Sequence, residues 1–226
     1  MESVFVVVFV VFGIAVAILA YYGYRSRLDR ERGLRSLALA EGLDFATEDP
    51  FDTAGQPFSL MQEGEGRGVE NVLWGFWHGL EVRVFDYWYY EESSDAEGGS
   101  SRSYTRFDCV IALIEASCPQ LRIGPENVLT RIASALSFDD IAFESDEFNR
   151  AFHVQGRDRR FATALCDARM MDWLLGNALG YSFEVTGDRM LCWTPQGHAE
   201  AKLDLLAIAK TFHDRIPPVV ASLYPR

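Results

Sequence analysis

Three arginines form the first group of residues in this chain whose types and spacing could bind a ligand. Arg157, Arg159 and Arg160 lie close together at a predicted helix start. Guanidinium groups beside free backbone N–H groups can hold an anion, so these arginines are candidate anion contacts. The alternative interpretation is a solvated helix face on which the arginines pair with nearby acidic residues.

Aromatic side chains form the second group, on a predicted β-hairpin. Tyr87, Tyr89 and Tyr90 lie near the end of its second strand. Neighbouring side chains of a strand point to opposite faces of the sheet, so one face becomes core and the other can meet a partner. We expect most aromatic residues of the hairpin to be core and these three tyrosines to be the candidate interaction surface.

The spacings that define common catalytic and metal sites are missing from the sequence. The four histidines and four cysteines show no zinc-site spacing. The glycine-rich stretch Glu63 to Gly68 carries acids and lacks the Lys-Ser/Thr of a phosphate loop. The acidic residues around Asp139-Asp140 do not follow the calcium-loop pattern. We therefore predict no catalytic residue, metal or cofactor, while an enzyme with a non-standard site stays open.

The elements that must position these residues begin with an apolar run. Ser3 to Tyr24 contain no charged side chain, and a helix of that length reaches across a hydrocarbon core of about 30 Å. We predict a transmembrane helix over residues 1–24, with the lipid bilayer as a partner. A cleaved signal peptide is the alternative, but Met1-Glu2 is not a positive leader and the apolar core is long for one.

Arginine-rich sequence follows this run and predicts the orientation of the chain. Residues 25–41 contain five arginines and read as a juxtamembrane helix. The positive-inside rule then places the N-terminus outside and the soluble domain in the cytoplasm of a single-pass protein. Gly13 and Ala17 have the spacing at which two helices can approach closely, so a homodimer is a further hypothesis.

Charge and cysteine content limit the partners of the remaining domain. The chain has a net charge of −12, which argues against general nucleic-acid binding because that needs a basic surface. The four cysteines fit free, mostly buried thiols in a reducing cytoplasm.

The strand and helix patterns of residues 42–226 predict a soluble α+β domain with a mainly antiparallel sheet and several amphipathic helices. The strongest signal is two strand patterns around the turn His78-Gly79. We expect Glu91–Ser103 to be a mobile loop, and Asp167 is a candidate helix cap. The other expected elements are a third strand over Tyr104–Ala116, a helix from Gly124 to Leu136, strands at Ile141–Glu144 and Arg150–Val154, a hairpin of Tyr181–Val185 and Met190–Trp193, and a final helix over Leu205–Ile216.

Four short stretches carry a resemblance to a protein family. They are Asn71-Val72-Leu73-Trp74-Gly75, Phe85-Asp86-Tyr87, Glu144-Ser145-Asp146-Glu147-Phe148-Asn149 and Asp167-Ala168-Arg169-Met170-Met171. With them the chain resembles uncharacterised membrane-anchored proteins of bacteria, chiefly actinobacteria. The resemblance implies a single N-terminal helix followed by such a domain, and no catalytic residue carries over from it.

Together these features favour a membrane-tethered cytoplasmic domain for protein interaction or scaffolding. The alternative is a membrane-bound enzyme or a small-ligand sensor with a non-standard site.

Overall fold

A single antiparallel sheet organises the protein in the computed structural model, which describes residues 2–94, 99–125 and 139–226. Its strand order is β1-β2-β3-β4-β6-β5, and β7 pairs with β4. All pairings in the described sheet are antiparallel, so the predicted α+β class with an antiparallel sheet is confirmed. The strands are β1 (Asp44–Glu48), β2 (Gly66–Trp77), β3 (Leu80–Ser94), β4 (Ser100–Gly124), β5 (Asp139–Asp140), β6 (His153–Gly156) and β7 (Ser182–Pro195).

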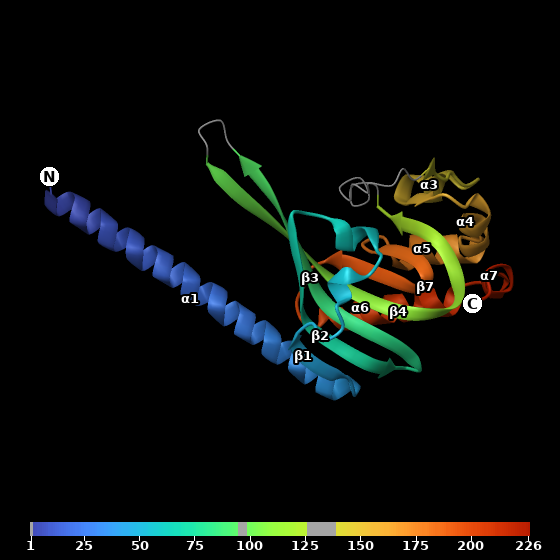
Figure 1. The fold of residues 1–226 in the computed structure, drawn as a ribbon, viewed down its shortest axis with the longest axis horizontal. Coiled ribbons are helices and arrows are strands. Elements are labelled where there is room, and N and C mark those ends of the chain that lie inside the picture. The colour runs from blue at the N-terminus through green and yellow to red at the C-terminus, as the bar shows by residue number, and fades with distance from the viewer. Residues whose placement is uncertain (1, 95–98, 126–138) are drawn as a thin grey trace.

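A long N-terminal helix extends away from the sheet, and short helices gather near the C-terminal end of the chain (Figure 1). Side-chain caps explain where several of these helices begin. Asp167, for example, accepts a hydrogen bond from the Met170 backbone N–H, which confirms it as a cap. The helices are α1 (Glu2–Glu41), α3 (Asp146–Ala151), α4 (Arg159–Leu165), α5 (Ala168–Asn177), α6 (Ala201–Arg215) and α7 (Pro218–Leu223), with 3₁₀ turns η1 (Thr53–Gly55) and η2 (Ser59–Gln62).

The predicted transmembrane helix over residues 1–24 is wrong. Among the described residues, no helix combines the length and the apolar character needed to cross a membrane. Helix α1 instead continues without a break through the arginine-rich segment to Glu41. Its last turns pack on the domain, where Leu34 and Ala38 are buried.

Both faces of the sheet are covered by apolar side chains. On one face α6 packs against β3, β4 and β7, and the end of α1 packs against β1 and β2. Leu34, Val84, Val110 and Phe212 belong to one core cluster on this face. The segment around η2 covers the other face and forms a second, smaller cluster. Because each face has its own cover, side chains that alternate along β3 are buried in both directions.

The turn at His78-Gly79 joins β2 to β3, as predicted. His78 has φ 48° and Gly79 has φ 81°, so both central residues are left-handed. This is the conformation that a two-residue hairpin turn of type I′ requires, because it matches the twist of the strands.

Two expected connections between strands differ from the structure. The predicted mobile loop Glu91–Ser103 is wrong at its two ends, because β3 and β4 stay paired as far as Ser94 and Ser100 and form a projecting ribbon (Figure 1). Residues 95–98 lie outside the described residues. The predicted hairpin around Gly187 is wrong, because β7 is one strand that pairs along β4. Gly187, with φ 55°, lies opposite Cys118 where the register shifts.

The segment between β5 and β6 contains the helix α3 where a turn between two strands was expected. The predicted strand at Ile141–Glu144 is absent from these described residues, and α3 begins directly afterwards because Ser145 caps it. The strand predicted over Arg150–Val154 starts only at His153. Most of the helix predicted from Gly124 to Leu136 lies outside the described residues.

Candidate interaction surface

Along one face of β3, buried apolar side chains are followed by a buried charged residue and then by half-buried aromatic rings. Val82 and Val84 belong to the larger core cluster. Asp86 follows on the same face, and Trp88 and Tyr90 continue beyond it. The cross-strand partners on β4 follow the same progression: Ala112, Val110, Asp108, Arg106 and Tyr104.

At the middle of this face, two aspartates and two basic side chains form a buried ion cluster. The Arg30 guanidinium lies 2.7 Å from both oxygens of Asp86, through Nε and Nη2, and its Nη2 lies 2.6 Å from Asp108. From α6, the Lys202 ammonium lies 2.8 Å from Asp86 and 2.9 Å from Asp108. Lys202 and the two carboxylates are buried, while Arg30 is 17 % exposed.

Backbone geometry brings further donors and acceptors to the ion cluster. A register shift in β2 places Asn71 at φ 55°, and its side-chain amide donates to Asp86 at 2.9 Å. The Gly197 N–H donates to Asp108 at 2.8 Å, and the Gly197 carbonyl accepts from Arg30 at 2.7 Å. The polar groups of the cluster are therefore paired with one another, which offsets the cost of burying charge.

The bases of the ion cluster keep Asp86 ionised. Burial by itself would raise the pKa of Asp86, but Lys202 and Arg30 beside it hold that pKa well below its usual range. Two positive and two negative groups then neutralise each other. Since the two bases come from α1 and α6, the cluster fastens both helices to the centre of the sheet.

Beyond the ion cluster, three aromatic rings form a ladder on the projecting ribbon. Trp88 and Tyr90 are stacked with centroids 6.5 Å apart, and Tyr104 lies 5.9 Å and 5.5 Å from them. Their neighbours on β2 are Gly68 and Gly66, where a Cβ would meet the Trp88 and Tyr90 rings at less than 3 Å. The glycines therefore let the two rings lie flat over the β2 backbone.

A groove runs between this aromatic ladder and α1. One hollow of about 490 Å³ is lined by Arg27, Glu70, Trp88, Tyr104 and Arg106. A neighbouring hollow of about 410 Å³ shares three of these residues and continues along α1 from Gly23 to Glu31. We call the two hollows together the stem groove.

Charged side chains border the stem groove and the ladder. Arg106 pairs with Glu70 at 2.9 Å, and the Arg102 guanidinium lies 4.6 Å from the Tyr90 ring centroid. Tyr104 is 52 % exposed. Aromatic rings and arginines on one exposed surface are the side chains that contribute most to protein interfaces.

The three tyrosines chosen from the sequence lie on two different faces. Tyr87 and Tyr89 are buried under the η2 segment, and the Tyr87 hydroxyl donates to the Leu60 carbonyl at 2.9 Å. Only Tyr90 lies on the face with the aromatic ladder. The candidate interaction surface is therefore Tyr90 with Trp88 and Tyr104, because alternation separates odd from even positions of β3.

The candidate anion contacts Arg157, Arg159 and Arg160 are all exposed at the start of α4. Asp158 caps this short helix, accepting from the Phe161 N–H at 2.9 Å and from the Tyr224 hydroxyl at 2.8 Å. A carboxylate thus already occupies the position where an anion would meet the helix N-terminus.

Sequence reasoning missed the ion cluster, although a signal for it existed. Asp86 stands between Phe85 and Tyr87, and Asp108 stands between Phe107 and Cys109. A charged residue inside an apolar strand pattern is rarely buried without a partner. The partners themselves are distant in sequence and carried no local signal.

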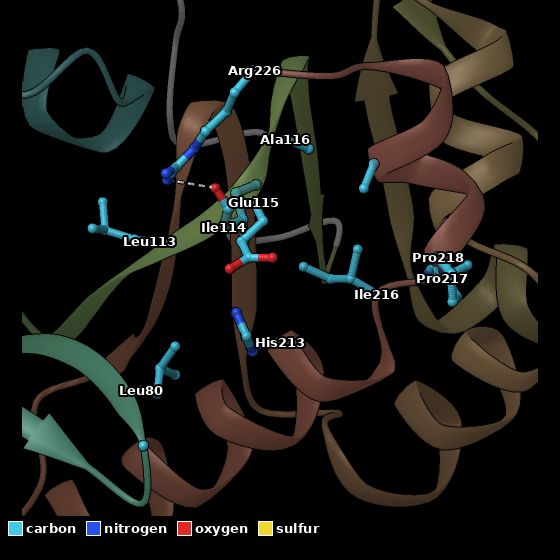
Figure 2. Close-up of a pocket in the computed structure, with 12 residues that line it drawn as sticks. Leu80, Leu113, Ile114, Glu115, Ala116, His213, Ile216, Pro217, Pro218 and Arg226 are labelled. Carbon is cyan, nitrogen blue, oxygen red and sulfur yellow. Dashed lines mark hydrogen bonds between the residues drawn. The ribbon is translucent and has the colours of Figure 1, made fainter.

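A second cavity of about 360 Å³ lies at the other end of β3, near the C-terminus of the chain (Figure 2). Aliphatic and proline side chains form most of its wall. Glu115, His213 and Arg226 reach into it from β4, α6 and the C-terminal segment. Among the described residues no group of three or more potential ligands is arranged to hold a metal ion.

With this geometry in place, comparisons with known proteins show the fold of the chain. No known family's sequence profile matches it, and no curated protein matches it. A solved structure does match, that of the mycobacterial trehalose monomycolate transport factor A, TtfA. The match covers 83 % of this chain and 96 % of that chain, with 14 % identity and a TM-score of 0.58. The two proteins are similar in fold, and the neighbour comes from an actinobacterium, as does most of the family that the sequence resembles.

Proposed function

We propose that this chain is an accessory factor that acts by binding a partner protein beside a lipid surface. The observation that carries the proposal is the stem groove, where partly exposed aromatic rings and arginines lie next to a helix that the ion cluster fixes in place. A preformed surface of this composition loses little conformational entropy on binding. In this proposal the stem groove is the surface that carries out the scaffold role expected from the sequence.

Two features support the lipid setting. Side chains of α1 from Val11 to Tyr24 are exposed and almost all apolar, on a helix that extends from the domain (Figure 1). Such a surface is stabilised by contact with another apolar phase. The structural neighbour is named as a transport factor for trehalose monomycolate, and we extend to this chain a role in a lipid-transport system.

A cytoplasmic site of action belongs to the same proposal. Cys109, Cys118, Cys166 and Cys192 are free and buried. Burial raises the pKa of the Cys166 thiol to about 12, which keeps that thiol protonated and unreactive. Four unpaired thiols are typical of a reducing compartment.

The partner-binding proposal is tested by Tyr104→Ala in the tagged full chain, purified with its partners from native membranes in mild detergent. We expect partner recovery to fall about tenfold, which corresponds to about 1.4 kcal/mol, because an exposed aromatic contact is lost. The matched control is Phe76→Ala, which removes a 71 % exposed ring outside the stem groove. Equal recovery from both variants would count against the stem groove as the binding surface.

The lipid setting is tested separately by flotation with vesicles of phosphatidylethanolamine and phosphatidylglycerol. We expect the full chain to float with the vesicles and a chain lacking residues 2–24 to remain at the bottom of the gradient. Flotation of both proteins would assign lipid contact to another surface.

A further inference from the structure

The cavity at the C-terminal end is a second site, separate from the stem groove. Gly79 and Leu80 of the β2–β3 turn line it, and this turn lies at the opposite end of β3 from the aromatic ladder. We propose that this cavity binds a single-chain amphiphile with an uncharged, hydroxyl-bearing head. The inference rests on the cavity alone and does not depend on the partner-binding proposal.

The wall of the cavity fits an aliphatic chain. Its volume of about 360 Å³ lies within the range of small-ligand pockets, roughly 300–1,000 Å³. Apolar side chains and backbone from three separate elements meet there, so a chain placed between them would be shielded from water on several sides. The apolar lining residues are Leu80, Leu113, Ile114, Ala116, Ile216, Pro217, Pro218 and Ala221.

Three polar side chains also line this cavity, among its apolar side chains. Figure 2 shows Glu115 and His213 pointing toward one another, with Arg226 on the far side of Glu115. Arg226 donates through Nη2 to the Ile114 carbonyl at 2.9 Å, and the same atom lies 3.8 Å from Asp188. On His213, Nδ1 lies 3.3 Å from Asp214.

The mixture of charges determines which head group fits. An anionic head beside Arg226 would be repelled by Glu115, and a cationic head beside Glu115 would be repelled by Arg226. A hydroxyl group both donates and accepts, so it can donate to the Glu115 carboxylate and accept from the guanidinium N–H groups. An uncharged polyol head on an alkyl chain matches this arrangement.

The test is photolabelling of the purified full chain with an octyl glucoside whose alkyl chain ends in a diazirine. We expect peptide mass spectrometry to place the label on residues 113–116 and on the segment 216–226. Competition identifies the head group. Unlabelled octyl glucoside should reduce the labelling of these residues at lower concentration than octanoate or octylamine does.

A matched pair of variants on α7 locates the site. Ala221→Phe places a ring at the cavity, and we expect labelling of residues 113–116 to fall about tenfold, which corresponds to about 1.4 kcal/mol. Ser222→Phe changes the next residue, which is exposed and does not line the cavity, and should label like the native chain. Both replaced residues are exposed, so we expect both variants to fold and to unfold at the same temperature.

Three outcomes would overturn the proposal. They are equal labelling of the two variants, label confined to α1, and stronger competition by octanoate or octylamine.

Discussion

At the scale of single residues, Arg30 joins α1 to the buried centre of the sheet. Its guanidinium meets both buried aspartates and the Gly197 carbonyl at once. Arginine suits this position because its planar group presents several N–H donors in fixed directions. Without it, Lys202 would face two carboxylates alone, and one negative charge would remain buried without compensation.

We therefore expect Arg30→Ala to lower the free energy of unfolding by about 3 kcal/mol, at the low end for a broken buried pair because Arg30 is partly exposed. Urea unfolding followed by circular dichroism measures this change. The control is Arg32→Ala, whose arginine is 67 % exposed and pairs with Asp29 at 3.5 Å, so about 0.5 kcal/mol or less is expected. Similar losses in both variants would mean that the ion cluster contributes little.

At the scale of elements, β2 and β3 are matched through glycine and aromatic residues. A Cβ at Gly68 would lie 2.7 Å from the Trp88 ring, closer than real side chains approach. The flat aromatic ladder on β3 therefore depends on the absence of side chains on β2. This complementarity also determines the shape of the stem groove, because Trp88 lines it.

Gly68→Ala should displace the Trp88 ring and destabilise the chain by about 1 kcal/mol, the lower limit for overpacking, because the ring is only half-buried. Near-ultraviolet circular dichroism should report the lost stacking of Trp88 on Tyr90. Gly176→Ala is the control, because nothing lies within 4 Å of the added carbon and alanine favours the helix α5. A spectrum of Gly68→Ala that matches that of the control would contradict the role of Gly68.

At the scale of the whole molecule, the ion cluster couples folding to pH. The pKa of Asp86 in the folded chain is well below its value of about 3.9 in an unfolded chain. The folded state therefore binds this proton less readily than the unfolded state. The resulting stability is fully present above about pH 4 and is lost as the pH falls further toward the folded-state pKa.

We expect the free energy of unfolding to fall steeply between about pH 4 and pH 2, with Asp86 as a main contributor. Urea titrations at a series of pH values measure this dependence. The Asp86→Asn variant should be less stable at pH 7 and should show a shallower acid limb, since this carboxyl no longer takes up a proton. If that variant does not fold, the carboxyl ¹³C shift of Asp86 in the native chain provides the test: it should still report a carboxylate at pH 3. A protonated Asp86 at that pH would contradict the prediction.

The sequence predicted correctly those features of the fold that depend on residues close to one another along the chain. The turn at His78-Gly79 and the cap at Asp167 follow from hydrogen bonds between residues a few positions apart, and both were correct. The strand patterns indicated an antiparallel sheet. The loop predicted over Glu91–Ser103 was wrong in its described residues, because its polar composition gave no indication that the two ends pair across the strands. This pairing includes the Arg102–Glu92 ion pair at 2.7 Å.

By itself, the sequence determined the α+β class, the hairpin and several helix starts, since these depend on local backbone preferences and the period of apolar residues. Only the tertiary structure decided which aromatic rings are exposed. Tyr87 and Tyr89 are buried because the distant η2 segment covers their face of the sheet. The ion cluster was likewise decided by packing, because Arg30 and Lys202 meet the aspartates only after α1 and α6 dock on the sheet.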